Sequence, residues 1–317
     1  MRGKQKKTVV IEGRVITLTN LQKIFWPDRD LTKAHLIKYY LEVAPLLLPH
    51  IYNRLLVMKR YPDGIAGEYF YQKECPAYAP EWVETYPVKH TRKVINYIVC
   101  NDTATLVWMA HQGCLEVHGW LSTVGNIDNP DLAVFDLDPA DGVSFRDVLR
   151  VALIVREMLE TLGIKGYPKT SGASGVHIFI PLDGGWPFAA VTAVMKFLAE
   201  KIAWAHPQIV TLERNKDRRA GKVYLDYLQN GRGKTMAFPY SVRPLPGAPV
   251  SAPLTWREVE EMQVEPNHFH LGNIGQRIKE KGDLFAGLLK EKQDLGRVLP
   301  KVGRLLPGAE VVAQRIY

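Results

Sequence analysis

The amino-acid sequence predicts an α/β fold, of α+β type, in which mixed or mostly antiparallel central sheets are flanked by helices. Short apolar runs typical of strands are interspersed with longer amphipathic segments typical of helices. The two kinds of segment follow one another without a strict βαβ rhythm, which disfavours an all-parallel sheet. The sequence contains neither Gly-x-Gly-x-x-Gly nor a Walker A motif, so nucleotide binding by the Rossmann or P-loop route is not expected.

The first third of the chain predicts one hairpin and two helices. Two apolar runs joined by a Glu-Gly turn predict a β-hairpin over residues 9–18. An amphipathic pattern over residues 31–48 predicts a helix that Thr32 caps and Pro49 ends. A shorter helix is expected over residues 101–111, behind an Asn/Asp cap.

The rest of the chain predicts three further strands and two long helices. The strands are expected at residues 132–135, 176–182 and 223–228. The helices are expected at residues 144–163, between a Ser144 cap and a Gly163 stop, and from Pro187 to about His206. The prolines of residues 245–253 predict irregular structure, and the charged sequence beyond them predicts a helical tail.

The chain of 317 residues carries an excess of positive charge. Lys and Arg outnumber Asp and Glu by 41 to 33, which gives a net charge of +8 and a pI near 9.2. Such an excess favours an acidic partner such as nucleic acid, although many ordinary proteins are also basic. Hydrophobic residues make up 46% and charged residues 23%, as in ordinary soluble globular proteins.

The cysteines and the N-terminus predict a cytoplasmic protein. Cys75, Cys100 and Cys114 are odd in number and form no Cys-x-x-Cys pair, which favours free thiols over a disulfide framework. The basic N-terminus is not followed by an apolar stretch of signal-peptide length. No segment approaches the length of a transmembrane helix, so no membrane contact is expected.

Three aspartates form a candidate metal centre. Asp136 and Asp138 follow a predicted buried strand, and residues i and i+2 of a strand point to the same face. Two such carboxylates repel each other unless a cation lies between them, and Mg²⁺ and Mn²⁺ prefer oxygen ligands. Asp226 is a lone charge in an apolar strand pattern, so its burial calls for a cationic partner. A third carboxylate completes a two-metal site for phosphoryl transfer.

The Asp-x-Asp pair is also compatible with three alternatives to a two-metal site. It can simply cap a strand-to-loop turn. Phosphatases of the haloacid-dehalogenase type place Asp-x-Asp after an apolar strand, but Pro139-Ala140 follows here in place of their usual Gly/Val and Thr. Metal-dependent glycosyltransferases use Asp-x-Asp to hold a sugar nucleotide.

A glycine-serine turn and an arginine provide candidate phosphate ligands. The run Ser-Gly-Ala-Ser-Gly from Ser171 predicts a tight turn whose backbone N–H groups can face an anion. His177 leaves this turn on the next strand and can donate to a phosphate oxygen, and Arg243 can make a bidentate phosphate contact. A polar hairpin and a solvated arginine are the plain alternatives. The order of these motifs around the aspartates favours phosphate binding.

Four motifs occur in a specific order along the chain: Asp-Leu-Asp-Pro, Ser-Gly-x-x-Gly-x-His, Leu-Asp-Tyr-Leu-Gln-Asn and Tyr-Ser-Val-Arg-Pro. This set resembles the archaeo-eukaryotic primase superfamily and, more narrowly, the polymerase domain of bacterial LigD, the repair polymerase of non-homologous end joining. The resemblance covers residues from about 18 to about 289. It implies a primase-polymerase fold and a single catalytic domain over residues 1–317. The implied parts are an N-terminal part to about residue 125 with 5′-phosphate and template contacts, a catalytic part over about 126–250, and a helical tail over about 251–317.

The resemblance also implies roles for individual residues. The metal-binding catalytic residues would be Asp136, Asp138 and Asp226. The incoming nucleotide would be held by Lys59, Phe70, Tyr71, Ser171, His177, Gln229 and Arg243. The 5′-phosphate at a DNA gap or break would be bound by Asn20, Lys23 and Lys33, with His118 near the template and the active site. Some relatives have lysine at the position of Ser174, which puts one phosphate contact in doubt.

The function implied by the resemblance is template-directed DNA/RNA nucleotidyl transfer at gaps or DNA ends, with Mn²⁺ or Mg²⁺ and with ribonucleotides accepted. The implied partners are DNA with a 5′-phosphate, nucleoside triphosphates and the end-binding protein Ku. A separate DNA ligase is also implied, because the sequence has no Lys-x-Asp-Gly ligase motif and resembles a stand-alone polymerase associated with the nucleoid. A DNA-end-bridging module with minor catalysis and a replicative or priming primase are the alternatives.

Two other segments have open interpretations. His111, Cys114 and His118 are spaced in a way that can suggest zinc, but they supply three ligands where a structural zinc site takes four. The charged run over residues 213–219 precedes the Asp226 strand. It is either a solvated loop or a contact to the template or the triphosphate.

Overall fold

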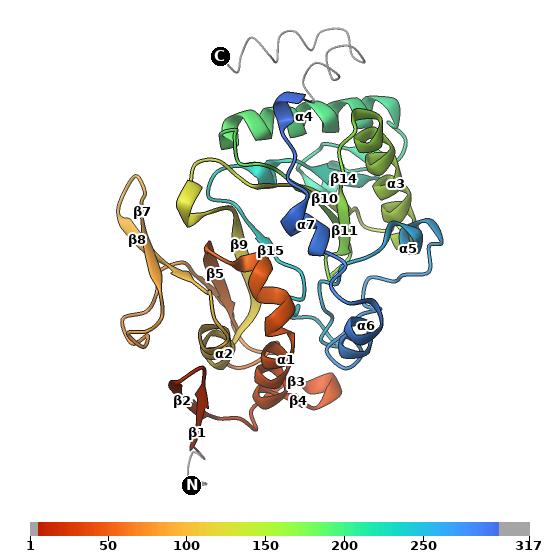
Figure 1. Cartoon of the computed structure of the whole chain (residues 1–317). Helices are drawn as coiled ribbons and strands as arrows, with labels where there is room; N and C mark the ends of the chain where they lie inside the picture. Colours follow the sequence, from red (N-terminus) through yellow and green to blue (C-terminus); the bar gives the residue numbers. More distant parts are fainter. Residues whose placement is uncertain (1–5, 298–317) are drawn as a thin grey trace. The chain divides into compact units, whose positions relative to one another are not determined.

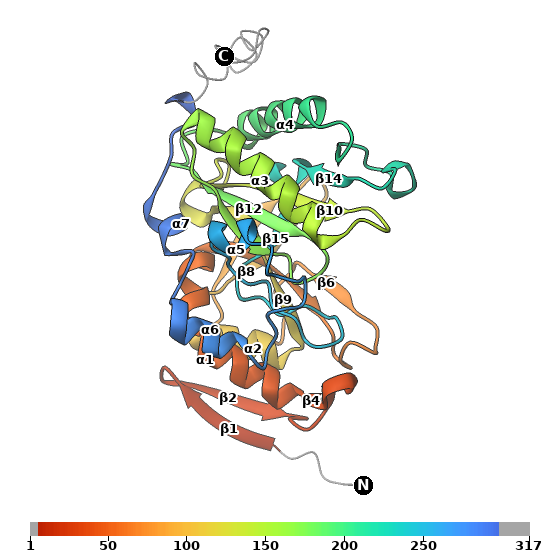
Figure 2. The ribbon, with the colours of Figure 1, turned by 90° about the vertical axis from the view of Figure 1, so that its right-hand side faces the viewer.

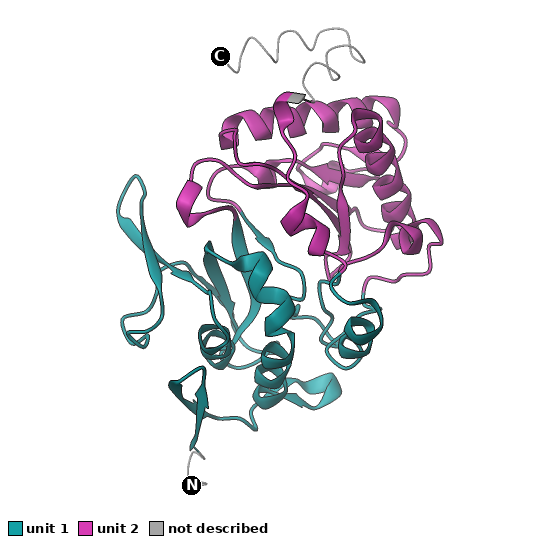
Figure 3. Ribbon diagram, viewed as in Figure 1, with its two compact units in different colours: residues 1–120, 235–252, 267–283 teal, residues 121–234, 253–266, 284–317 magenta. Residues whose placement is uncertain are grey.

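Two units of the chain, each made of several sequence segments, appear in the computed structural model, which describes residues 6–297 (Figure 3). Unit 1 consists of residues 1–120, 235–252 and 267–283. Unit 2 consists of residues 121–234, 253–266 and 284–317. The single catalytic domain expected from the resemblance, with its division near residue 125, remains a prediction.

Unit 2 is built on a five-stranded sheet with the strand order β11-β12-β10-β14-β13 (Figure 2). All neighbouring strands are antiparallel except β13 and β14, which are parallel. The strands are β10 (Leu132–Pro139), β11 (Tyr167–Thr170), β12 (Val176–Pro181), β13 (Val210–Thr211) and β14 (Val223–Asp226). β10 lies in the centre of the sheet, and its residues are buried as far as Leu137.

Two long helices cover one face of this sheet. α3 (Phe145–Leu162) and α4 (Phe188–Ala205) contact each other and both contact β10. α3 begins where Ser144 accepts a hydrogen bond from the Asp147 N–H, and it ends at Gly163, whose φ of 73° is the left-handed conformation that glycine adopts easily. The shorter helices of unit 2 are α5 (Trp256–Glu260) and α7 (Ala286–Lys290).

Unit 1 is built on a six-stranded sheet with the order β15-β9-β5-β8-β7 and with β6 paired to β5 (Figure 1). Its strands are β5 (Arg54–Arg60), β6 (Phe70–Gln72), β7 (Thr85–Lys89), β8 (Val94–Val99), β9 (Cys114–Thr123) and β15 (Thr235–Ala237). Its helices are α1 (Lys33–Ile51), α2 (Thr103–His111) and α6 (Ile274–Lys281). Two small two-stranded sheets complete it: β1 (Lys6–Ile11) with β2 (Arg14–Thr19), and β3 (Ile24–Trp26) with β4 (Leu31–Thr32).

In the part of the chain that the structure describes, five short 3₁₀ helices connect these elements: η1 (Pro27–Arg29), η2 (Val124–Asn126), η3 (Lys216–Arg218), η4 (Leu228–Asn230) and η5 (Leu295–Arg297). Cys75, Cys100 and Cys114 are free thiols. Within residues 6–297, no helix combines the length and the apolar composition needed to span a bilayer.

The predicted fold class is confirmed, as are the N-terminal hairpin, the caps of α1, α2 and α3, and the strand that carries Asp136 and Asp138. The predicted stop at Pro49 is wrong, because α1 continues to Ile51 with both Pro45 and Pro49 inside it. Proline removes one N–H bond of a helix. Burial of the last-turn side chains, including Ile51, holds the turn together nonetheless.

Two other boundaries differ from the predictions. The strand expected to reach residue 228 ends at Asp226, because the Asp226 carboxylate accepts the Leu228 N–H at 2.7 Å and turns the chain into η4. The expected helical tail beyond residue 251 consists of the short helices α5, α6 and α7. The part of that tail over residues 298–317 lies outside the described residues.

Asn230 continues the hydrogen bonding of β10 beyond the end of β14. Its Oδ1 accepts the Val134 N–H at 2.8 Å, and its Nδ2 donates to the carbonyls of Val134 and Tyr227, both at 2.8 Å. Asn230 is completely buried. Its amide therefore takes the place of a peptide group on a neighbouring strand, just before the aspartates of β10.

We expect Asn230→Ala to lower the free energy of unfolding by about 2–4 kcal/mol, because it leaves a buried N–H and a buried carbonyl of Val134 without their partner. Urea titration followed by circular dichroism measures this change. Asn215→Ala is the matched control, since Asn215 is exposed and caps only η3. Its expected loss is about 1 kcal/mol or less. Equal losses in the two variants would contradict the role assigned to Asn230.

Candidate active site

A row of four polar residues crosses the sheet of unit 2. The strand register places Lys169 of β11 opposite His177 of β12. The same His177 lies opposite Asp136 of β10, and Asp136 lies opposite Asp226 of β14. The four residues therefore occupy one line across four neighbouring strands. The predicted proximity of Asp136, His177 and Asp226 is a consequence of this register.

Close polar contacts connect the first three residues of the row. The Nζ atom of Lys169 lies 2.9 Å from Nδ1 of His177. On the other side of the ring, Nε2 of His177 lies 3.3 Å from Oδ1 of Asp136. All three side chains are buried, and Lys169 has no solvent exposure at all. The histidine thus bridges a buried cation and a buried carboxylate.

Asp138 adds a second carboxylate to the same strand, two residues after Asp136. Burial, together with the negative charges of Asp136 and Asp226, raises the pKa of Asp138 from 3.8 to about 7, while Arg219 opposes the rise. The protein thus concentrates negative charge at the end of β10, and a bound cation would relieve this repulsion.

Asp226 is held by neutral donors. Its Oδ1 accepts the Leu228 N–H at 2.7 Å, and its Oδ2 accepts from Nε2 of Gln229 at 2.9 Å. The sequence predicts a cationic partner, whereas these contacts are amides. An ionised carboxylate has about four lone pairs, so Asp226 can keep both amides and still offer oxygen to a metal. Gln229, predicted to lie near the nucleotide, contacts Asp226.

The residues at the end of β10 fit a divalent cation by their chemistry. Hard oxygen donors and excess negative charge are what Mg²⁺ and Mn²⁺ require. Among residues 6–297, however, no three His, Cys, Asp or Glu side chains are arranged as a ready cluster of metal ligands. The amide contacts of Asp226 are one reason why the three aspartates do not form such a cluster, because these contacts hold the Asp226 oxygens in the turn that begins η4. The metal role of the three aspartates remains a prediction.

The glycine-serine turn lies directly against β10. A Cβ atom on Gly175 would lie 2.3 Å from the Leu137 carbonyl oxygen, so only glycine allows this approach. Oγ of Ser171 accepts the N–H groups of Ala173 and Gly175, both at 3.0 Å. These two N–H groups, predicted to face an anion, are therefore directed at Ser171, because a buried hydroxyl lies within their reach. Ser174 is exposed at the tip.

A buried carboxylate that the sequence analysis did not select organises a cluster in unit 1. Glu116 of β9 lies 2.7 Å from Nζ of Lys59 and 2.8 Å from Nε of Arg243, and Nε2 of His118 is 3.6 Å away. Glu116 has no solvent exposure. Burial opposes its ionisation, but His118, Arg243 and Lys59 outweigh burial and lower the pKa of Glu116 to about 2.

Two of the predicted nucleotide-site residues and the predicted template-side residue His118 thus share one partner. Lys59, His118 and Arg243 come from separate segments, and Glu116 brings their side chains together. The sequence contains a pattern that points to Glu116 as a site residue, because Glu116 is a lone charge in an apolar strand, as Asp226 is. Lys169 of unit 2 was not predicted as a site residue either, because a lysine near a turn is usually solvated.

The predicted aromatic pair lies on β6, beside this cluster. Tyr71 is opposite Lys59 and Phe70 is opposite Arg60 in the register of β6 with β5. The rings of Phe70 and Tyr71 are 45% and 55% exposed, respectively. The Tyr71 ring lies 6.2 Å from the His118 ring, and the Lys59 ammonium lies 5.7 Å from it. Exposed rings with cations nearby are suited to stacking on a base.

The predicted 5′-phosphate residues also come together within unit 1. The Lys23 N–H donates to the Asn20 carbonyl at 3.0 Å, and the Lys33 N–H donates to the Lys23 carbonyl at 2.8 Å. The Lys23 ammonium donates to the Pro62 carbonyl at 2.8 Å. Burial, reinforced by the charges of Lys23 and Arg60, lowers the pKa of Lys33 to about 8. The Lys23 ammonium also pairs with the exposed carboxylate of Asp63, and a phosphate placed here would compete with that carboxylate.

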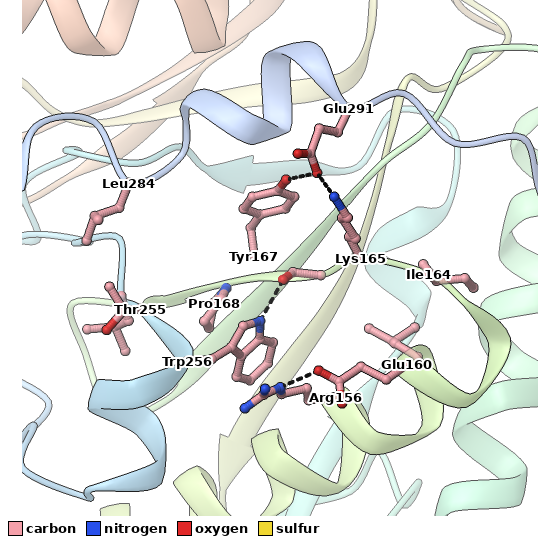
Figure 4. Close-up of a pocket in the computed structure, with 13 residues that line it drawn as sticks. Arg156, Glu160, Ile164, Lys165, Tyr167, Pro168, Thr255, Trp256, Leu284 and Glu291 are labelled. Atoms are coloured by element: carbon pink, nitrogen blue, oxygen red, sulfur yellow. Dashed lines mark hydrogen bonds and ion pairs between the residues drawn. The ribbon is translucent and has the colours of Figure 1, made fainter.

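A separate pocket of about 370 Å³ in unit 2 lies away from the predicted site residues (Figure 4). The close-up shows its polar groups engaged with one another. Glu291 accepts from Tyr167 at 2.6 Å and pairs with Lys165 at 2.9 Å, and the Trp256 N–H donates to the Gly166 carbonyl at 2.9 Å. The polar groups that line this pocket are thus engaged with one another.

The antiparallel sheet that carries Asp136, Asp138 and Asp226, with the glycine-serine turn against it, defines a domain of the primase-polymerase class. The chain belongs to the family of LigD primase-polymerase domains, whose family model matches residues 32–285. The motifs identified in the sequence therefore indicated the family correctly.

Named relatives agree with this assignment. The multifunctional non-homologous end joining protein LigD of Mycolicibacterium smegmatis is 35% identical over 275 residues, which are 86% of this chain and 36% of that protein. The bifunctional LigD of Bacillus subtilis is 36% identical over 281 residues, or 88% of this chain and 45% of that protein. The chain thus spans less than half the length of these two curated relatives.

A solved structure shares the fold over nearly its whole length. It is the polymerase domain from Mycobacterium tuberculosis ligase D in complex with DNA, with a TM-score of 0.82 and 33% sequence identity. The similarity covers 88% of this chain and 99% of that chain.

We expect Asp138→Asn to raise the melting temperature of the metal-free protein by about 2–4 °C at pH 8, because it removes one of several repelling carboxylates. An acid with a raised pKa in the folded state loses stability as pH rises from its ordinary value to the raised one. The gain should therefore be complete above pH 7 and absent below pH 4. Calorimetry with EDTA measures it.

Addition of Mn²⁺ gives the complementary observation. The ion should raise the melting temperature of the wild-type protein and have a much smaller effect on Asp138→Asn, because one oxygen ligand is lost. A variant that melts below the wild type in EDTA, or that responds equally to Mn²⁺, would show that Asp138 is not part of a metal centre.

Proposed function

We propose that this chain is a template-directed nucleotidyltransferase that fills gaps or extends DNA ends in end-joining repair. The observation that carries the proposal is the pairing of Asp136 with Asp226, beside Asp138, in a fold shared with a LigD polymerase domain. The relatives are named for non-homologous end joining, and the similar structure is a complex with DNA. Template-dependent extension of a DNA end is the activity that accounts for the aspartates, the shared fold and the names of the relatives.

In this proposal Asp136, Asp138 and Asp226 hold Mn²⁺ or Mg²⁺. Two such ions, when bound, activate the primer 3′-hydroxyl and neutralise the leaving pyrophosphate. His177 donates its Nε2–H to a phosphate oxygen. Ser171 still has its hydroxyl proton available as a donor, because its oxygen accepts from two N–H groups of the turn.

The cluster around Glu116 supplies further nucleotide contacts. Arg243 and Lys59 are already desolvated and oriented by Glu116, so they bind a phosphate group with little loss of side-chain entropy. Phe70 and Tyr71 stack on a base. Ribonucleotides are accepted beside deoxynucleotides, as the family resemblance implies.

The cellular setting completes the proposal. The chain acts at DNA ends associated with the nucleoid, together with Ku and a separate DNA ligase. Its positive charge holds DNA mainly through phosphates, so affinity falls with salt. Priming by a replicative primase is the alternative cellular role.

We expect Asp136→Ala to lower extension of a gapped, 5′-phosphorylated duplex with Mn²⁺ and labelled nucleotides by at least about 100-fold, because a metal ligand is lost. Asp128→Ala is the control, since Asp128 is exposed and pairs with the surface residue Arg232. The control should retain wild-type extension. No extension by the wild type would refute the polymerase function, and an active Asp136→Ala would refute the site.

A DNA-end-bridging module is the second candidate, because the cluster of Lys23 and Lys33 is independent of the aspartates. Binding experiments with the Asp136→Ala protein distinguish the two functions. A bridging module would show end binding and no extension in the wild type as well as in the variant.

We expect Lys23→Ala to weaken binding to a gapped duplex with a 5′-phosphate about tenfold, because a charge-assisted contact is lost. Binding to the same duplex without that phosphate should change little. Fluorescence anisotropy with both duplexes measures the difference. Lys196→Ala on α4 controls for loss of one surface charge, since Lys196 is exposed. Equal wild-type affinity for the two duplexes would refute the pocket.

The protein should also bind the duplex with a 5′-phosphate less strongly, relative to the duplex without it, as pH rises above about 8, because Lys33 loses its proton there.

A further inference from the structure

Lys169 is a completely buried cation for which the proposed reaction has no use. It lies on β11, its ammonium is 2.9 Å from Nδ1 of His177, and the ring of Phe179 is 5.5 Å away. Placing an ammonium group out of contact with water is unfavourable. The role of a lysine kept in that position must therefore lie in its effect on its neighbours.

The ammonium group determines the protonation pattern of the histidine. A protonated Lys169 has three donors and no acceptor, so its contact with Nδ1 of His177 is a hydrogen bond only when Nδ1 accepts. A neutral imidazole carries its proton on one nitrogen only, and that proton therefore lies on Nε2. Nε2 is the atom that faces Oδ1 of Asp136 at 3.3 Å.

We propose that Lys169 is a positioning residue that fixes His177 as the Nε2–H tautomer and aims that N–H at the end of β10. In the resting protein the N–H faces Oδ1 of Asp136 at 3.3 Å. With nucleotide bound, the same N–H donates to a phosphate oxygen, a step that rests on the proposed function.

The opposite tautomer would work against binding. A proton on Nδ1 would leave a lone pair on Nε2, which would then face the Asp136 carboxylate and any phosphate oxygen placed beside it. Acceptor would face acceptor at both contacts. The Nε2–H form is therefore the one that both contacts require, and Lys169 selects it.

The backbone holds Lys169 in place from both sides. β11 pairs with β12 so that Lys169 is opposite His177, and a bridge on the other edge of β11 joins Lys169 to Pro253. The Leu254 N–H donates to the Pro168 carbonyl at 2.8 Å on that same edge. Little movement of the lysine relative to the imidazole is possible.

The test uses ¹⁵N NMR of the imidazole rings in the full chain at pH 8, with His177→Gln to assign the His177 signals. The wild type should show a protonated Nε2 and an unprotonated Nδ1. Lys169→Met, which keeps the length and removes the donor, should shift the population toward Nδ1–H. Lys169→Arg, which donates only, should restore the wild-type pattern.

Lys165→Met is the matched control, because Lys165 lies four residues earlier and pairs with Glu291 at the surface. It should leave the His177 signals unchanged. A wild-type His177 protonated on Nδ1, or a His177 pattern in a folded Lys169→Met protein identical to that of the wild type, would overturn the proposal. If Lys169→Met does not fold, Lys169→Gln takes its place, because its amide oxygen can accept from Nδ1–H and should likewise shift the proton toward Nδ1.

Kinetics separate this proposal from the proposed function. Lys169→Met should raise the KM for the nucleotide about tenfold, as expected for one misdirected charge-assisted hydrogen bond, with a smaller change in kcat. Lys169→Arg should recover most of this loss. An unchanged KM beside a shifted tautomer would overturn the nucleotide contact. Absence of extension by the wild type would refute the polymerase function, while the tautomer result would stand by itself.

Discussion

The register of β10 between its two neighbours is the constraint on which the candidate site depends. It places Asp136 opposite both His177 and Asp226, and a slip by one residue would turn every one of these side chains to the other face of the sheet. Gly175 fixes the register from outside, because its lack of a side chain allows the turn to lie against the Leu137 carbonyl. The close packing at Gly175 and the alignment of the polar side chains therefore require the same register of β10.

In each unit a group of candidate site residues surrounds a completely buried ionisable residue, which is acidic in unit 1 and basic in unit 2. In unit 1 the carboxylate of Glu116 gathers cations that can bind an anion. In unit 2 the ammonium of Lys169 orients a histidine beside carboxylates that can bind cations. In the proposed function neither buried group contacts the substrate. Each restricts the neighbouring groups that are proposed to bind it, which lowers the entropy lost on binding.

Local patterns predicted the fold class, the N-terminal hairpin, helices α1 to α4 and strands β10, β12 and β14, but not the strands of the unit 1 sheet, whose pairing joins distant segments. Caps such as Ser144 and Asp102, the turn before Arg14 and the apolar runs depend on a few neighbouring residues, and the structure agrees with them. The errors arose where distant contacts outweigh a local preference, as in α1, where buried side chains outweigh Pro49. The family motifs indicated the aspartates and His177, but Glu116 and Lys169 act through partners that only the register brings together.

The hydrogen bonds between Asn230 and β10 also affect the long-term chemical stability of this protein. Asn230 is followed by Gly231, and an Asn-Gly step in a mobile loop readily loses ammonia when the glycine nitrogen attacks the side-chain amide. Here that amide is engaged with Val134 and Tyr227, and the Gly231 N–H donates to the Leu228 carbonyl at 3.1 Å. The folded state thus shields a fragile bond. Deamidation would begin from unfolded molecules, and it would leave a carboxylate facing the Val134 carbonyl on any attempt to refold.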